Sequence, residues 1–285
     1  MTQQVIDVPT KTEEKIPQIL IGVPILAWSH EFATSFLNFW TALMTCDRAG
    51  RKFTVGYKFA YRRPVHMAEN ELTEFAIQTG CTHILLMDDD IYDVTPQDLF
   101  NLLDADKDVV GGIMFTSKFP YAMCAFRRYD LKTRVIEQPI LNTPARLYEI
   151  PPDQQVGVQP ADLIPFGFTL IKTDVFKKIR KPWFECNNQA PTDSFFMDSV
   201  MDAGIKPYAH FGVWLNHNGI TRQTKPHMFN MEMEKQKSQP GKIITVNAED
   251  MNRHMISMDL KMKDAEKERL KLDTAGQLFH TPIGG

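Results

Sequence analysis

The sequence predicts an α/β fold in which helices flank a mixed, mostly parallel central sheet. Apolar runs of strand length recur along the chain, and amphipathic helical patterns separate them. Several of these runs are continuously apolar, which is typical of strands that are covered on both faces. With 285 residues and 43% hydrophobic content, the chain can bury a large core. This alternation of strands and helices favours an α/β fold with a mostly parallel sheet over an all-β or all-α fold.

The expected elements follow one another along the chain at ordinary loop spacing. We predict strands at Gln18 to Leu26, Lys52 to Tyr57, Ile84 to Met87, Asp108 to Met114, Phe168 to Ile171, and one or two more ending in His217. Helices are expected at Glu31 to Met44, from Ala68 to Gly80, Pro96 to Leu103, Thr173 to Lys178, and from Thr192 to Gly204. Residues 127–160 predict one or two edge strands and a long connection.

Domain organisation is predicted from shifts in composition. Residues 1–16 are polar and predict a disordered lead-in, and residues 17–224 predict one domain. Residues 225–285 form a C-terminal extension rich in Met, Lys and Glu, in which residues 248–272 have the pattern of an amphipathic helix. Packing of this helix on its own domain is the default, and a homo-oligomer or another partner is the alternative.

Charge and composition exclude several classes of protein. The net charge is -3 and the pI about 6.2, so no basic field predicts binding to nucleic acid. The four cysteines have no zinc-site spacing and predict free thiols. The N-terminus lacks the plan of a signal peptide, and no apolar run reaches the ~20 residues of a membrane span. We therefore expect a soluble protein of the cytoplasm, or of the host cytoplasm if the protein is viral.

Three consecutive carboxylates, Asp88, Asp89 and Asp90, follow the strand expected at Ile84 to Met87. In open α/β sheets, ligands bind at the carboxyl ends of the strands. Like charges packed together at that edge are costly unless a cation or hydrogen-bond donors compensate them. The triplet therefore indicates a site for a divalent cation and phosphate.

A solvated turn that caps the next helix is the structural alternative for this triplet. That helix, however, has its own capping residues, because Thr95 precedes Pro96 and Asp98 lies in the first turn. The three acids are then left without a capping role, which favours the metal interpretation.

Other candidate binding residues lie near the same edge of the sheet. Arg62 and Arg63 follow the second strand and suit a diphosphate or nucleobase, although a solvated pair is an equal alternative. Gly111 lies inside a buried strand, where the missing side chain indicates the close approach of a ligand or of backbone.

The ordered set of motifs resembles GT-A fold glycosyltransferases, in particular the family 2-like group that uses nucleotide-sugar donors. The resemblance rests on HILLMDDD, GFTLIK, PWFE, an acid that opens a helix before an AGI turn, and LNHNG. It extends over about residues 17–222 in the same order, and it implies a Rossmann-like GT-A sheet. The order of the motifs is more specific than the acidic motif alone.

The resemblance implies a Mn²⁺ or Mg²⁺ ion that bridges the two phosphates of the donor. The family's DxD motif falls on Asp88, Asp89 and Asp90, with Asp90 as metal ligand and Asp88 beside the metal and the ribose. His217 matches the histidine that completes the metal site in many relatives, and His210 is the competitor if the register differs.

The resemblance also implies a catalytic base and a nucleotide. The base falls on Asp193, although Thr192 stands where relatives carry Glu, which puts an acceptor contact in doubt. Asp193 is equally explained as an acid that the dipole of the helix favours. The loop after Pro24 departs from the family pattern for the nucleobase and so leaves the base open. Uracil is the common choice in such folds, and guanine is the alternative.

These expectations together describe a glycosyltransferase that moves a sugar from a UDP-sugar or related donor to an unknown acceptor hydroxyl. The stereochemical outcome stays open. A nucleotidyltransferase is one alternative, but it would want a Gly- and Lys-rich loop that residues 22–31 lack. A non-catalytic module for sugar binding or assembly is the other alternative.

Overall fold

The structure is a computed structural model, and it describes residues 16–117, 121–128, 147–186 and 191–221, together with Thr224 and Met231. For residues 128 and 147–149 only the backbone is described. All of the expected lead-in except Ile16 lies outside these ranges. So do most of the C-terminal extension, including its predicted helix, and part of the long connection at 127–160.

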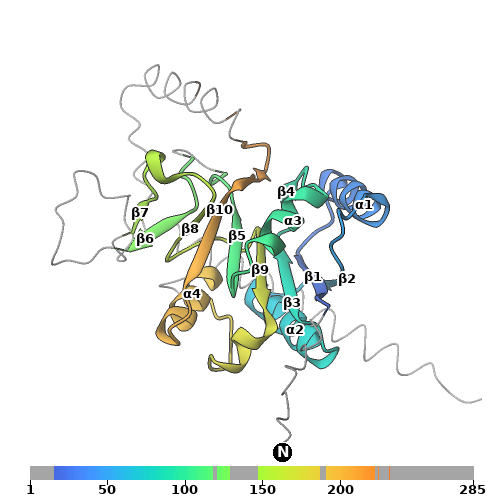
Figure 1. Cartoon of the computed structure of the whole chain (residues 1–285), viewed down its shortest axis with the longest axis horizontal. Helices are drawn as coiled ribbons and strands as arrows, with labels where there is room; N and C mark the ends of the chain where they lie inside the picture. Colours follow the sequence, from blue (N-terminus) through green and yellow to red (C-terminus); the bar gives the residue numbers. More distant parts are fainter. Residues whose placement is uncertain are drawn as a thin grey trace, which may run out of the picture. The chain divides into compact units, whose positions relative to one another are not determined.

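Within the described residues the central sheet has seven strands, in the spatial order β2-β1-β3-β9-β5-β10-β8 (Figure 1). The strands are β1 (Gln18–Ile25), β2 (Thr54–Tyr61), β3 (His83–Met87), β5 (Val109–Ile113), β8 (Val158–Pro160), β9 (Phe168–Lys172) and β10 (Pro207–Trp214). Strands β2, β1, β3, β5 and β10 run in one direction, and β9 and β8 run in the other. The predicted mixed, mostly parallel sheet is therefore confirmed.

Two short antiparallel ribbons stand beside this sheet. One pairs β4 (Ile91–Tyr92) with β11 (Asn216–His217), and the other pairs β6 (Phe126–Arg128) with β7 (Leu147–Glu149). The first ribbon matters for the site, because it joins the residues just after β3 to the residues just after β10.

Helices cover both faces of the sheet. α1 (His30–Thr45) and α3 (Pro96–Asp104) pack on one face, and α2 (Val65–Gln78), α4 (Thr192–Asp202) and the 3₁₀ turn η2 (Thr173–Lys177) pack on the other. A second 3₁₀ turn, η1 (Pro152–Gln154), lies in the long connection. None of the described helices combines the length and the hydropathy needed to cross a bilayer.

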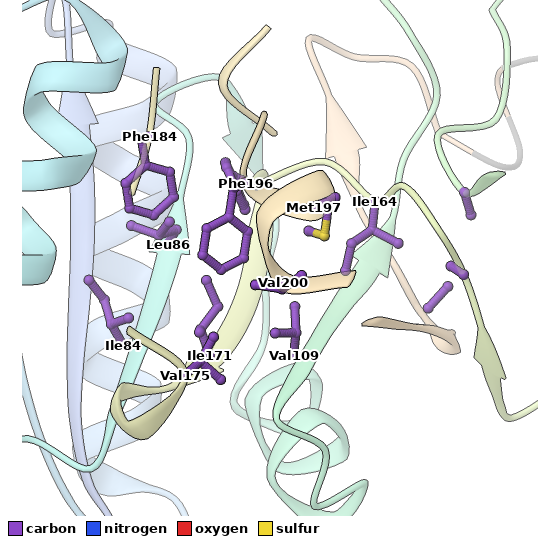
Figure 2. Packing of buried hydrophobic residues seen from close by; sticks show 14 of the residues in the cluster. Ile84, Leu86, Val109, Ile164, Ile171, Val175, Phe184, Phe196, Met197 and Val200 are labelled. Carbon is purple, nitrogen blue, oxygen red and sulfur yellow. The ribbon is translucent and has the colours of Figure 1, made fainter. Parts of the chain in front are cut away.

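Strand β3 is buried on both faces, as its continuous apolar run predicts. Ile84 and Leu86 belong to the cluster under α2 and α4, whereas Leu85 and Met87 belong to the cluster under α1 and α3. All four are at most 1% exposed. Figure 2 shows the first cluster, where Phe196 of α4 lies over the side chains of this face.

The second strand lies further along the chain than the predicted Lys52 to Tyr57. The amide of Thr54 donates to the carbonyl of Pro17 over 2.9 Å, and this bond starts the pairing with β1. Pairing then continues until Tyr61 is level with Ile25. The strand therefore delivers its last residue to the same edge of the sheet as β1.

The predicted helix from Thr173 to Lys178 is the single 3₁₀ turn η2. Thr173 does not cap it. The Thr173 hydroxyl instead donates to the carbonyl of Cys81 over 2.7 Å, just before β3 begins. A side chain predicted to serve its own helix thus joins two segments that are distant in the sequence.

Gly111 has an explanation inside the sheet, and its predicted role as a binding residue stays a prediction. A Cβ at this position would lie 2.4 Å from the Thr169 Oγ1 and 3.0 Å from the Ile164 Cδ1. Gly111 pairs with Thr169 inside the sheet, and Thr169 is level with Leu86, two residues before the acidic triplet. Packing of side chains against the backbone therefore explains the missing side chain.

This packing predicts a loss of stability for Gly111→Ala. The added methyl group has no room without a shift of Thr169, and overpacking of a tight core typically costs about 1–3 kcal/mol. Gly56→Ala in β2 is the control, since a Cβ there would meet nothing within 4 Å and its φ is not positive. Urea unfolding measures both. Equal stability of the two variants would contradict the packing explanation.

Candidate active site

The acidic triplet lies at the carboxyl end of β3, as predicted. The strand ends at Met87, and the amide of Asp88 donates to the carbonyl of Gly167 over 3.2 Å. The next helix, α3, has the predicted capping box, in which Asp98 accepts from the backbone of Thr95 over 2.8 Å. The triplet is therefore not used as a helix cap.

Asp89 joins the end of β3 to the end of β1. β1 pairs with β3 only as far as Gly22, and Pro24 lies beyond that point, level with Ala60 of β2. Further along, the backbone N–H of Leu26 donates to the Asp89 Oδ2 over 3.0 Å. Burial raises the pKa of Asp89, and backbone donors partly offset this rise. Asp89 thus stabilises the edge where the two strands separate.

Asp90 contacts the residues that follow β10. Its Oδ2 lies 3.1 Å from the Nε2 of His217 and accepts from the side-chain amide of Asn218 over 3.0 Å. The backbone of Asn218 also donates to the carbonyl of Asp90 over 3.1 Å. These contacts follow from the β4–β11 ribbon, which brings two of the three predicted metal-binding residues, Asp90 and His217, together.

The ring of His217 is oriented by a second contact. Its Nδ1 lies 2.6 Å from the carbonyl oxygen of Phe115, and because a carbonyl only accepts, Nδ1 carries a proton. Nε2 is then the nitrogen that faces Asp90. Metal-bound histidines are commonly held in this way, with the other ring N–H on a backbone carbonyl.

The pKa values of His217 and His210 are shifted in opposite directions. Burial lowers the pKa of His217, but the contacts with Asp90 and Phe115 outweigh it, so the pKa is raised overall. The competitor His210 accepts from the amide of Gly212 over 3.0 Å, and burial lowers its pKa. His217, and not His210, is the histidine that contacts the triplet.

Asp88 is the most perturbed member of the triplet. Burial raises its pKa to about 7, and the charges of Asp90 and Asp193 add to this effect, while His217 opposes it. A bound cation would favour the ionised form of this carboxyl group and offset both the burial and the repulsion. Carboxylate oxygens and an imidazole suit Mn²⁺, so the residues fit the implied metal. In the described part of the chain, however, no group of three or more His, Cys, Asp or Glu side chains is arranged so that it could hold a metal ion.

Asp193 lies in the first turn of α4, where the carboxyl group accepts from the amide of Ser194 over 2.7 Å. Burial raises its pKa to about 6, although the backbone donors lower it. Asp193 also raises the pKa of Asp88, so the two carboxylates lie in one electrostatic neighbourhood. This electrostatic effect links Asp193 to the triplet, and its role as the base stays a prediction. Its location also agrees with the alternative of an acid at a helix N-terminus.

Sequence reasoning missed one acid of this neighbourhood, Glu69. Its side chain is 1% exposed, and its Oε1 accepts from the hydroxyl of Thr192 over 3.1 Å. The signal was present, because Glu69 lies on the apolar side of α2 with the buried Ala68, Leu72 and Ala76. An acid on the buried face of a helix is rare unless it is paired.

The two predicted binding arginines, Arg62 and Arg63, lie at the surface. Both are exposed. The Arg63 Nε lies 2.9 Å from the Glu71 Oε2 on α2, so this guanidinium already has an anionic partner. The Arg62 amide donates to the carbonyl of Ile25 over 2.8 Å, and its guanidinium lies 4.9 Å from the centre of the Tyr61 ring. Arg62 therefore stands at the correct edge, while Arg63 is held against α2.

No family model and no curated protein matches this sequence. The fold is similar to that of solved structures. A197 from STIV has a TM-score of 0.46 and 15% identity, over 71% of this chain and 85% of that one. GalNAc-T7 with UDP, GalNAc and Mn²⁺ has a TM-score of 0.41 and 10% identity, over 71% of this chain and 43% of that one. For apo UDP-glucose pyrophosphorylase the values are 0.40 and 8%, over 78% and 100%. These similarities concern the fold and assign no activity to this chain.

The raised pKa of Asp88 predicts how the free energy of unfolding depends on pH. Its pKa is raised from 3.8 to about 7, so the folded protein loses stability as the pH rises through this window. Asparagine does not titrate. With EDTA present we expect Asp88→Asn to raise the Tm at pH 8, and the difference from wild type to vanish toward pH 4. Thermal unfolding across this pH range measures the effect, and a variant that is less stable at pH 8 would contradict it.

Proposed function

We propose that this protein is a metal-dependent glycosyltransferase, which transfers a sugar from a nucleoside-diphosphate sugar to an acceptor hydroxyl. UDP is the expected nucleotide. One observation supports this most: Asp90, which follows β3, lies 3.1 Å from His217, and the charges of Asp90 and of the separate acid Asp193 both raise the pKa of Asp88. In this proposal the carboxylates that end β3 form the donor site, and Asp193 forms the base site.

On the donor side, Asp90 and His217 would hold Mn²⁺ or Mg²⁺, with Asp88 beside them. When bound, such an ion neutralises the charge that gathers on a departing nucleoside diphosphate. Asp89 contributes by holding the ends of β1 and β3 together through Leu26. Arg62 stands at the same edge, where its guanidinium suits the nucleotide.

On the acceptor side, Asp193 acts as the general base. It takes the proton of the acceptor hydroxyl while that oxygen forms a bond with the anomeric carbon. The bond between this carbon and the diphosphate oxygen breaks, and its electron pair leaves with the nucleoside diphosphate. A pKa of about 6 leaves Asp193 ionised at neutral pH and still basic enough to accept a proton.

A panel of nucleotide sugars tests this proposal. The protein is incubated with each donor, Mn²⁺ and a set of sugar and polyol acceptors, and release of nucleoside diphosphate is followed with and without EDTA. We expect EDTA-sensitive release with one class of donor. Release of pyrophosphate from a nucleoside triphosphate and a sugar phosphate would instead indicate a nucleotidyltransferase. If no donor reacts and calorimetry detects no Mn²⁺-dependent uptake of nucleotide, the proposal fails.

A further inference from the structure

Glu69 is a buried carboxyl group without full compensation. Its Oε1 accepts from the Thr192 hydroxyl, but its Oε2 is buried and has no hydrogen-bond partner in the described residues. A buried carboxyl group with one bare oxygen is costly, and replacing such a polar pair by apolar groups of similar shape is often neutral or stabilising. Stability alone therefore does not explain why α2 has an acid here.

The next residue, Asn70, holds the chain segment that leads to α4. Its Oδ1 accepts from the amides of Trp183 and Phe184 over 3.0 and 3.4 Å. Its Nδ2 donates to the carbonyl of Phe184 over 2.7 Å. Two consecutive residues of α2 thus bind the chain at two places. Asn70 binds the backbone of Trp183 and Phe184 before α4, and Glu69 binds Thr192, the first residue of α4.

The residue after Thr192 is Asp193. Thr192 is 7% exposed, so its hydroxyl bond to Glu69 is shielded from water. The helix then continues with the amide of Phe195 donating to the carbonyl of Pro191 over 3.1 Å. The hydrogen bond to Glu69 fixes the position of Thr192. It therefore also fixes the direction in which the side chain of the next residue, Asp193, points from α4. Glu69 feels the charges of both Asp88 and Asp193, which agrees with this proximity.

We propose that Glu69 is a positioning residue, which acts through the Thr192 hydroxyl to hold Asp193 beside Asp88, with Asn70 supporting the preceding segment. The inference rests on the proposed function, in which Asp193 is the base. The carboxyl group of Glu69 on α2 thus accepts from the hydroxyl of the first residue of α4. Glu69 itself is buried and does not touch substrate.

The test compares variants that keep or remove the bond. Glu69→Gln keeps an oxygen for Thr192, whereas the double variant Glu69→Leu with Thr192→Val replaces both partners by apolar groups of similar size. Glu74→Leu, on the more exposed side of α2, is the matched control. For each variant we measure kcat, the KM of donor and acceptor, the affinity for Mn²⁺ with UDP, and the Tm.

We expect the double variant to lose about 10–100-fold in kcat, because misplacement of a reacting group by about 1 Å has effects of this size. Its donor KM, its affinity for Mn²⁺ with UDP and its Tm stay near those of wild type. Glu69→Gln and Glu74→Leu keep kcat within about threefold. A merely structural role predicts the opposite pattern, namely a lower Tm and little change in the kcat of the folded fraction, and this result would overturn the proposal. So would a loss that falls on donor KM rather than on kcat.

Hydrogen exchange supplies a measurement that does not need activity. In the double variant we expect faster exchange at the first turn of α4, including the amide of Phe195, and unchanged exchange in β3. Unchanged exchange at this turn would overturn the positioning role even if the enzyme is active. If wild type transfers no sugar at all, the proposed function fails, and the exchange experiment still decides whether Glu69 orders the start of α4.

Discussion

Asp193→Asn is expected to lower kcat by about 10²–10⁴-fold, the range that general base catalysis typically contributes. The amide is isosteric with the carboxyl group and still accepts from the amide of Ser194, so α4 should keep its start. It cannot take a proton from the acceptor hydroxyl. The affinity for Mn²⁺ with UDP should stay within about threefold of wild type, because Asp90 and His217 are unchanged.

The pH profile distinguishes a base from a structural acid. The pKa of Asp193 is raised to about 6, and only the ionised form accepts a proton. In wild type, kcat/KM should therefore fall about tenfold for each pH unit below about 6 and be level above it. In Asp193→Asn this limb should disappear from the residual rate. Burial is the first cause of the raised pKa, so the limb should lie well above the ordinary range of an aspartate.

Asp202→Asn is the matched control, since Asp202 lies exposed at the other end of α4. It should leave both kcat and the pH profile unchanged. If Asp193→Asn kept the full transfer rate, Asp193 would be only an acid that stabilises the helix N-terminus, and the base would have to be sought elsewhere.

The central sheet could be predicted because its strands are buried on both faces. Such strands give continuous apolar runs, as Ile84 to Met87 show, and no polar alternation obscures them. The end of β2 could not be predicted in this way. Tyr57 and Tyr61 are exposed, so the strand lacks a clear apolar limit and its length depends on pairing with β1.

A site residue could be predicted only where the sequence shows both its residue type and its position at the end of a strand or the start of a helix. Three acids after a buried strand are visible in sequence, and so is an acid that opens a helix. The contact of Asp90 with His217 depends on the β4–β11 ribbon, whose two-residue strands are too short to recognise. Glu69 was missed because its partner, Thr192, is 123 residues away. The packing that explains Gly111 could not be predicted either, because the side chain that needs its space, Thr169, comes from another strand.

Asp90→Asn is expected to abolish most of the Mn²⁺-dependent binding of UDP. Asparagine can still accept a hydrogen bond from the side chain of Asn218. It has no negative charge, however, with which to attract a cation beside His217. Loss of an outer partner of a metal site alone typically costs about 10–100-fold in metal affinity. A direct ligand should cost at least the upper end of this range, and kcat should fall with it.

Calorimetry of UDP binding with and without Mn²⁺ measures this effect, and Asp89→Asn is the control from the same triplet. Asp89 binds the backbone of Leu26, and an amide oxygen can replace that acceptor. If the triplet acts only through its summed negative charge, both variants should weaken Mn²⁺ binding equally. If Asp90 is the ligand, Asp89→Asn should keep most of the affinity, while His217→Ala should weaken it as Asp90→Asn does. Equal losses for Asp89→Asn and Asp90→Asn would therefore contradict a specific metal site and favour a diffuse acidic surface.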